Sequence, residues 1–367
     1  MGSIALHDKV AHHPLGAASY YFKTALVQYL NNQCPRSPVA IHIGSQPNCS
    51  PHIGNITTFA TGFSIAAALK EQYDREVRVV FVLVDTAPSP NANEHAPTTI
   101  DGVNYQRSLK QTGDLEQHTS PLIRVLQRLS ELSDIPYGIE TQSLWRSTPV
   151  FASILQKIVA QRDFLGPRLS PETGRLAIRA SCPQCGLADK HGINNRYDND
   201  GRTITFSCPQ HGDYIVDMTC HEDLQRLEFN TPLRNLIRIL ICSQDTTRSW
   251  IMCTGSDYAG FYQEQLLWRL LEGRVDGPVI CYAPLILDWS GGKLSKSLYV
   301  ETGAYQYLVD SGRGYMLDAD VFLGCEGGSE ALFEEVREWV RKPYKLFRDY
   351  SVEYMDFKLR ERGMRVL

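Results

Sequence analysis

Short apolar runs rich in branched residues constrain the fold of this chain more than any other feature. Four such runs occupy residues 38–44 (PVAIHIG), 77–84 (VRVVFVLV), 249–254 (SWIMCT) and 278–288 (PVICYAPLILD). Runs of this kind are typical of strands that are buried on both faces of a parallel sheet. We therefore expect an α/β fold with a Rossmann-like parallel sheet, to which residues 137–141 add a weaker candidate strand.

Segments with apolar residues at helical spacing separate these runs. Helices are predicted over residues 51–71, with Pro51 in the first turn, and from Ser120 onward, where Ser120 is a candidate N-cap. Residues 151–165 and 259–272 also favour helices. A strand, a helix and a second strand in this order form the right-handed parallel unit from which such sheets are built.

Residues 173–217 interrupt this alternation, because they are rich in Gly, Asn, Asp and Cys and contain few apolar runs. We interpret them as an inserted ribbon-like module that splits one domain into two halves. The predicted parts are an N-terminal helical extension (1–36), the first half of the Rossmann-like domain (37–172), the insertion (173–217), the second half (218–300) and a short helical C-terminal region (301–367).

The composition excludes several classes of protein. Apolar residues make up 43% of the chain and charged residues 21%, which is typical of globular rather than disordered or fibrous proteins. With 37 basic and 41 acidic residues the net charge is −4, so a nucleic acid would have to bind at a local patch. No 18-residue apolar stretch and no apolar leader core is present in the sequence, so we expect a cytoplasmic protein with neither a membrane nor a DNA partner.

The cysteine spacing carries the sharpest local signal. Without an export signal, ten cysteines indicate reduced thiols or metal ligands rather than disulfides. The segment Cys-Pro-Gln-Cys is followed, after 22 residues, by Cys-Pro-Gln-His, and each segment is followed by Gly. Two such turns match a closed tetrahedral, structural Zn²⁺ site with three thiolates and one imidazole. The alternatives are four unrelated residues, or Cys220 or His221 in place of the histidine ligand. The predicted ligands are Cys182, Cys185, Cys208 and His211.

A second motif lies between the first strand and the first helix, in the segment 47–55 (PNCSPHIGN). Free N–H groups at a helix N-terminus favour a phosphate, and His52 adds a hydrogen-bond donor for a developing anion. The alternative is a capped helix with a surface histidine.

A third motif, 291–297 (GGKLSKS), follows the last strand of the predicted sheet. Lys293 and Lys296 behind a Gly hinge can fold over a polyphosphate, whereas the alternative is a solvated basic loop. Both this motif and the segment around His52 follow strands of one sheet. They are therefore expected at its carboxyl ends, where ligands bind.

These segments resemble a known family. IHIGSQPNCSPHIGN and GGKLSKS are similar to the two signature motifs of class I aminoacyl-tRNA synthetases, HIGH and KMSKS, in the same order. CPQCG and CPQHG lie where class I lysyl-tRNA synthetases carry zinc-binding insertions. LEFNTPLRNLIR and TGSDYAGFYQEQ resemble the segments that precede and form the fourth strand and the amino-acid pocket. The resemblance covers residues 37–300 and implies a Rossmann-like catalytic domain of the HUP type.

The resemblance implies roles for individual residues. A nucleotide or tRNA 3′-end site would include His52, Gly54, Asn55, Lys293, Ser295 and Lys296. The amino-acid pocket would include Asp85, Asp257, Tyr258 and Gln263. The candidate catalytic residues are His52, Tyr258, Tyr262 and Glu264, of which the last three are equally well read as pocket wall or helix surface. The basic residues that would bind tRNA, or are instead solvated or ion-paired, are Arg175, Arg179, Arg234 and Arg238.

Two departures from the synthetases decide the preferred hypothesis. Asp85 is followed by Thr-Ala-Pro rather than by a second acidic residue, and 70 residues follow KLSKS, too few for a helical anticodon-binding domain. The first departure puts the chemistry of that corner in doubt. The missing domain would be dispensable in a cyclodipeptide synthase, which shares the class I fold but takes aminoacyl groups from charged tRNAs. Acidic residues such as Asp85 and Asp257 would suit an arginyl group, so we favour the compact arginine-containing group found in fungi. The expected substrates are arginyl-tRNA and a second aminoacyl-tRNA, and the expected product is an arginine-containing diketopiperazine.

Other hypotheses remain open at this point. The main alternative is a synthetase-like enzyme of the lysine or arginine type that activates an amino acid with ATP and Mg²⁺. A truncated synthetase that modifies a nucleoside, a non-catalytic tRNA-binding module and a more distant nucleotidyltransferase complete the set.

Overall fold

The structure is a computed structural model that describes residues 25–89, 97–113, 115–116, 119–259, 278–295 and 303–366. Most of the expected N-terminal extension and nearly all of the helix predicted over 259–272 lie outside the described residues. In the described part of the chain, no helix combines the length and the apolar character that crossing a bilayer requires.

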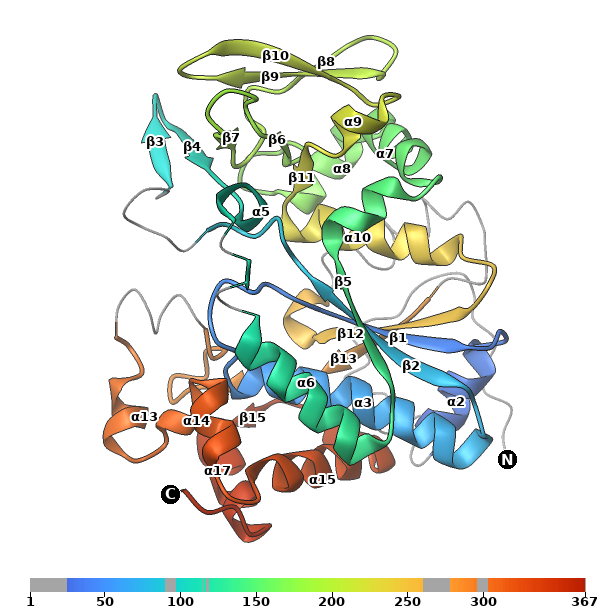
Figure 1. Cartoon of the computed structure of the whole chain (residues 1–367), viewed down its shortest axis with the longest axis vertical. Helices are drawn as coiled ribbons and strands as arrows, with labels where there is room; N and C mark the ends of the chain where they lie inside the picture. The colour runs from blue at the N-terminus through green and yellow to red at the C-terminus, as the bar shows by residue number, and fades with distance from the viewer. Residues whose placement is uncertain are drawn as a thin grey trace.

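A five-stranded parallel sheet forms the centre of the molecule (Figure 1), as the apolar runs predicted. Its strand order is β13-β12-β1-β2-β5. The strands are β1 (Val39–Ser45), β2 (Val77–Leu83), β5 (Tyr137–Thr141), β12 (Ser249–Gly255) and β13 (Val279–Ala283). The chain builds outward from β1 on one side and then returns to the other side with β12, so the order reverses between these two strands. This Rossmann-like topology places a ligand crevice at the carboxyl ends of β1 and β12.

One face of the sheet is covered by helices from both ends of the chain. Figure 1 shows α3, α6 and α15 together on this side. Helix α3 approaches β1 closely at Gly62, where a Cβ atom would lie only 2.5 Å from Cδ1 of Ile43. The absence of a side chain at Gly62 allows this approach. The elements of this layer are α2 (Leu26–Gln33), α3 (Ile53–Tyr73), α6 (Ser120–Ser133), α13 (Gln306–Asp310), η4 (Gly314–Met316), α14 (Ala319–Gly324), α15 (Gly328–Arg341), α16 (Pro343–Leu346) and α17 (Val352–Glu361).

The C-terminal region is part of this core and also supports the last strands of the sheet. Trp339 and Leu359 are fully buried in the same apolar cluster as the sheet residue Ile41. Strand β15 (Tyr350–Ser351) pairs in parallel with β14 (Ile286–Leu287). Just before β15, the Asp349 carboxylate accepts a hydrogen bond from the backbone N–H of Leu285 at 2.9 Å. Residues 303–366 therefore complete the α/β domain rather than forming a separate unit.

The opposite face carries a second apolar core and the inserted module. The helices here are η2 (Gln142–Ser147), α7 (Phe151–Ala160), α8 (Arg162–Leu169) and α10 (Thr231–Ser243). Phe206 and Val216 of the module belong to the same buried cluster as Leu155 of α7 and Leu236 of α10. The module therefore shares its core with the helices that cover the sheet.

The inserted module consists of short strands. Its strands are β6 (Ile178–Ala180), β7 (Ala188–Asp189), β8 (Arg196–Tyr197), β9 (Thr203–Cys208), β10 (Gly212–Asp217) and β11 (Leu227–Phe229), with the short helix α9 (His221–Leu224) between the last two. Strand β11, which lies beyond the expected limit at residue 217, pairs with β6 and brackets the module. Strands β3 (Thr98–Ile100) and β4 (Val103–Gln106) join it through pairing of β4 with β7, and α5 (Leu109–Thr112) follows them.

Candidate functional site

A cavity of about 370 Å³ lies where the strand order of the sheet reverses. The ends of β1 and β12 contribute Ser45 and Gly255 to its lining. The segment around His52 and the loop that contains Lys293 line the same cavity. Two segments that are about 240 residues apart in the sequence thus face one space, as their positions after strands of one sheet predicted.

His52 begins helix α3 and is held by a reciprocal pair of hydrogen bonds. Its Nδ1 atom accepts from the backbone N–H of Gly54 at 3.1 Å, and the Asn55 Oδ1 atom accepts from the backbone N–H of His52 at 3.3 Å. Since Nδ1 accepts a hydrogen bond, the proton of the neutral ring is on Nε2. The side chain is only 7% exposed, so the alternative of a surface histidine is wrong: the residue caps the helix and lines the cavity at the same time.

The loop after β14 brings Lys293 to the opposite wall of the cavity. The Lys293 ammonium forms an ion pair with the Asp257 carboxylate at the end of β12, and its Nζ atom lies 5.7 Å from the centre of the Tyr258 ring. Asp257 and Tyr258 belong to the short 3₁₀ helix η3 (Ser256–Tyr258). Ser295 also lines the cavity. With His52, Gly54 and Asn55 from the other segment, seven of the residues assigned to the nucleotide and amino-acid sites therefore line this cavity.

Two arginines of α10 line the cavity from the opposite face of the sheet. Arg234 and Arg238 are each 7% exposed, so they are not the surface contacts for tRNA that we expected. Both side chains line the cavity instead. The Arg238 Nη1 atom lies 3.4 Å from Nδ1 of His42 on β1. It also occupies the space beside Gly44, where a Cβ would approach it to 3.1 Å.

His42 is a buried residue that the sequence analysis did not single out. Burial first, and then the adjacent Arg238 charge, hold the pKa of His42 well below its ordinary value, so the ring is neutral. Its position inside the apolar run PVAIHIG was the available signal, because a histidine in a buried strand needs a specific neighbour.

The charges that line the cavity are predominantly positive. Among the described lining residues, the permanent cations are Arg234, Arg238 and Lys293, and Asp257 is the one carboxylate. A buried arginine pair and a mobile lysine favour a ligand with anionic groups such as phosphates. The carboxylate of Asp257 could in turn form an ion pair with one cationic group of the same ligand.

Asp85 takes a different role from the one expected. It is buried, and its carboxylate accepts hydrogen bonds from the backbone N–H of Ser143, at 3.2 Å, and from the Ser143 hydroxyl. Val84 lines the cavity, but Asp85 is not among the described residues that do so. Its carboxylate therefore anchors η2 to the end of β2 and does not belong to an amino-acid pocket here.

Arg179 is likewise enclosed, which corrects its assignment as a tRNA contact. Its Nε atom lies 3.6 Å from Oε2 of Glu228, and its Nη2 atom donates to the carbonyl of Phe229 at 3.2 Å. The other carboxylate oxygen of Glu228 accepts from the Ser108 hydroxyl at 2.6 Å. This buried network joins β6 and β11 to the start of α5. Of the four assigned arginines, Arg175 is the one at the surface.

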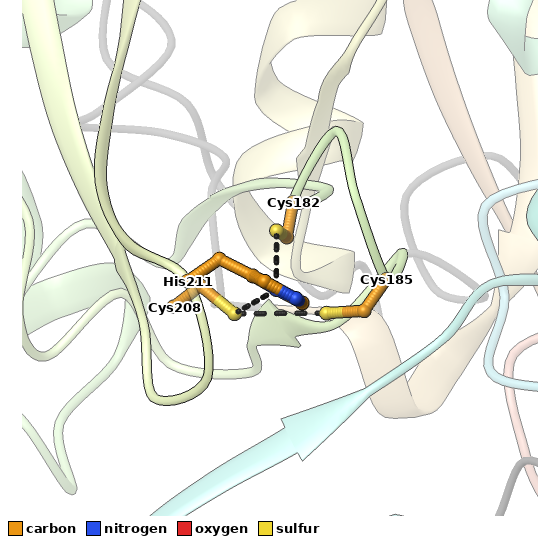
Figure 2. Close-up of side chains that lie close together, drawn as sticks. All are labelled: Cys182, Cys185, Cys208 and His211. Carbon is orange, nitrogen blue, oxygen red and sulfur yellow. Dashed lines mark hydrogen bonds between the residues drawn. The ribbon is translucent and has the colours of Figure 1, made fainter.

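The four predicted metal ligands form a compact cluster (Figure 2). The Cys182 and Cys208 sulfurs each lie 3.5 Å from Nδ1 of His211, and the Cys185 and Cys208 sulfurs are 3.6 Å apart. All four ligand atoms lie within 4.8 Å of one another. A tetrahedral metal site with sulfur ligands at about 2.3 Å has edges of about 3.8 Å, so these residues fit a metal ion.

The turns around the cluster explain the repeated glycine. Gly212 has a φ of 75°, a left-handed conformation that glycine adopts without steric cost and that turns β9 into β10. Cys220 and His221, the alternative ligands, do not belong to the cluster among the described residues.

Burial raises the pKa of the Cys182 thiol, but backbone N–H groups of Cys185 and Gln184 outweigh this effect and bring the pKa to about 7.

Four of the assigned residues lie outside the described part of the chain. They are Tyr262, Gln263, Glu264 and Lys296. Their roles remain predictions from the resemblance.

Comparison with known proteins finds distant structural likeness only. No protein-family model matches the chain, and no curated protein matches it. A glutamate-tRNA synthetase from Elizabethkingia anophelis has a TM-score of 0.37 and 12% identity, over 87% of this chain and 69% of that chain. A putative arginyl-tRNA synthetase from Campylobacter jejuni has a TM-score of 0.35 and 10% identity, over 94% and 90%.

The arginyl-tRNA synthetase of Thermus thermophilus has a TM-score of 0.38 and 14% identity, over 90% of this chain and 63% of that chain. Such distant likenesses leave the residues of the cavity as the basis for a functional proposal.

Proposed function

We propose that this chain acts on aminoacyl groups carried at the 3′ end of tRNA and joins two of them into an arginine-containing cyclic dipeptide. The observation that carries this proposal is the meeting of two segments, around His52 and around Lys293, over one cavity at the carboxyl ends of the sheet. These are the segments that resemble the two signature motifs of class I synthetases.

The charge of the cavity supports binding of an RNA end. Arg234, Arg238 and Lys293 offer charge-assisted hydrogen bonds to phosphate oxygens, and the Nε2–H of His52 is a further donor. A volume of about 370 Å³ lies at the lower end of the range for small-molecule sites. That volume suits one nucleoside with its aminoacyl group.

Asp257 is the proposed partner of the arginyl side chain. As the one carboxylate among the described lining residues, it can accept two parallel hydrogen bonds from a guanidinium. Its present partner is Lys293, which is 42% exposed at its side chain and therefore free to move toward a phosphate. We propose that the RNA phosphate attracts Lys293 away, which leaves Asp257 for the substrate cation.

The proposed reaction consists of two aminolysis steps. The α-amine of one aminoacyl ester attacks the carbonyl carbon of the other; a C–N bond forms, the ester C–O bond breaks, and the released ribose hydroxyl retains a proton from the amine. The amine of the resulting dipeptidyl ester attacks its own ester carbonyl in the same way. This second step closes the six-membered ring and releases the second tRNA.

The chain's own residues would supply position, proton transfer and charge stabilisation. Holding one ester in the cavity with its carbonyl open to the amine of the second replaces a random encounter, and the Nε2–H of His52 can stabilise the developing oxyanion. Tyr258 is the described candidate for relaying a proton during these steps, together with Tyr262 and Glu264 outside the described residues.

We further propose that the metal cluster binds Zn²⁺ as a structural ion. Four protein ligands leave no open position for water, so the ion would supply folding energy to the module rather than chemistry. Arg175, which is exposed near the module, remains the proposed contact to the tRNA acceptor stem.

An ATP-dependent, synthetase-like activation of lysine or arginine is the second candidate. The observation that favours it is the position of Lys293 and Ser295, from the KLSKS segment, in the same cavity as His52. In this case the cationic groups would hold the phosphates of ATP, with Mg²⁺ as the accompanying ion.

One experiment separates these candidates. The purified chain is incubated with arginyl-tRNA and a mixture of other charged tRNAs, without ATP, and small products are analysed by mass spectrometry. The proposal expects a diketopiperazine of arginine, with D257N as a variant that loses the arginine-containing product. Amino-acid-dependent exchange of pyrophosphate into ATP, without such a product, supports the synthetase instead. Binding of tRNA without either reaction leaves a non-catalytic module.

A further inference from the structure

The turn that leads to Lys293 presents an exposed aromatic side chain. Trp289 is 73% exposed at the tip of a hairpin whose outgoing arm is β14 and whose returning arm contains Lys293. Trp289 is the most exposed large apolar side chain in the described part of the chain, and an indole offers a flat face on which a planar group can stack.

The hairpin holds this indole on a well-ordered support. The backbone N–H of Asp288 donates to the carbonyl of Gly292 at 2.8 Å, and that of Leu294 donates to the carbonyl of Ile286 at 2.9 Å. The Asp288 carboxylate accepts from the backbone N–H of Ser290 at 2.9 Å and from the Tyr305 hydroxyl at 3.2 Å. The backbone of the hairpin is therefore already ordered in the folded chain, so binding of a ligand would not have to order it.

The position of the hairpin suggests what would stack there. Lys293 and Leu294 of its returning arm line the cavity, and Trp289 precedes Lys293 by four residues in the same hairpin without lining the cavity itself. The cavity suits one nucleoside, so the unpaired nucleotide that precedes it in the RNA must lie outside. The base of that nucleotide would emerge beside the hairpin that already supplies a lysine for its phosphate.

We propose that Trp289 is a stacking platform for the unpaired base that precedes the terminal nucleotide of the tRNA 3′ end. The inference rests on the proposed function, because it requires that the cavity takes the terminal aminoacyl nucleoside. Stacking of unpaired bases on aromatic side chains tolerates any base and is a common means of holding single-stranded RNA.

The test uses the full chain, W289A and W289F, and two probes. The first probe is an RNA minihelix with a single-stranded 3′ CCA end, and the second is adenosine 5′-monophosphate. We expect W289A to bind the minihelix roughly 10- to 100-fold more weakly, W289F to restore most of the affinity, and all three proteins to bind the mononucleotide equally. Tryptophan fluorescence should be quenched by the minihelix in the wild type and much less in W289A.

A matched control is F357A, which removes another exposed aromatic side chain from α17; Phe357 is 59% exposed. This variant should bind the minihelix like the wild type. If W289A and the wild type bind the minihelix equally, the stacking role is overturned while the proposed function stands. If the wild type itself does not bind the minihelix, the proposed function fails first. A change of oligomeric state in W289A with unchanged RNA affinity would assign Trp289 to a protein contact and overturn the proposal.

Discussion

The metal cluster and the cavity are built in opposite ways. The four ligands of the cluster come from residues 182–211, in two turns that each place two ligands three positions apart. The cavity draws on β1, α3, α10, β12 and the hairpin after β14, which span residues 44–295. In the first site local spacing determines the chemistry, whereas in the second the strand order of the sheet determines which side chains meet.

This difference has energetic consequences. A cluster of three sulfurs and one imidazole contributes stability only when all four ligands bind a metal ion. Without the ion, removing these polar groups from water costs free energy. The cavity is supported by a large apolar core on both faces of the sheet and needs no ligand to persist. Changes at the two sites should therefore affect different properties.

The largest effect is expected when a metal ligand is removed. C182S or C208S should reduce bound metal from one ion per chain to none and open the module to proteolysis, since structural zinc contributes about 10–16 kcal/mol in small zinc-binding peptides. Metal analysis of the purified protein and limited proteolysis measure both outcomes. C220S is the matched control, because Cys220 is exposed and outside the cluster. A full equivalent of metal in C182S would contradict the assignment.

A smaller effect, on turnover and not on stability, is expected at the cavity wall. K293A should lower kcat about 10²–10³-fold, as loss of a donor to a developing or bound anion does elsewhere. Its melting temperature should stay close to that of the wild type, because exposed ion pairs contribute about 0–1 kcal/mol.

K70A provides the comparison for K293A, since Lys70 forms an exposed ion pair with Asp134 at 2.9 Å on α3, and it should retain full turnover. Equal activity of K293A and K70A would remove Lys293 from the site.

His52 should separate the two kinds of effect within one residue. H52A loses the cap of α3 and should lower the free energy of unfolding by about 1 kcal/mol. H52N restores a side-chain acceptor at the N-cap and should recover that stability, but not turnover, because the imidazole N–H is still missing. Chemical denaturation and a product assay on both variants measure the split. Full turnover of H52N would assign His52 to capping alone.

The smallest effect is expected from pH. Because the pKa of His42 is held well below 6.5 in the folded chain, protonation favours the unfolded chain, and stability is complete above pH 6.5 and lost as the pH falls toward the folded pKa. Between pH 7 and pH 6 this group should cost about 0.7 kcal/mol. Denaturation of the wild type and H42Q at both pH values isolates the difference. An equal pH response of the two proteins would contradict a neutral, buried His42.

The sequence predicted the sheet and the meeting of the four Cys and His side chains because both depend on local patterns. The apolar run at 77–84 became β2 (Val77–Leu83), and the doubled Cys-Pro-Gln segments became the cluster. The pairing of β11 with β6, about 50 residues earlier, was not predicted, because no local pattern encodes it.

Side-chain placement at the cavity was harder to predict for the same reason. The spacing of Arg234 and Arg238 placed them on one side of a helix, but only the packing of α10 against the sheet turned that side inward. Asp85 directly follows the apolar run at 77–84, but its carboxylate accepts hydrogen bonds from Ser143, which the sequence did not predict. Exposure and hydrogen-bond partners depend on neighbours that are distant in sequence.

The pairing of β15 with β14 also sets an order of assembly during synthesis. A chain leaves the ribosome from its N-terminus, so the ligands at 182–211 emerge and can capture a metal ion well before Tyr350 appears. The hairpin that carries Trp289 and Lys293 lacks its neighbouring strand until then. Nascent chains that stall before residue 350 should therefore contain the Cys and His cluster in place, but should lack the strand that supports the hairpin beside the cavity.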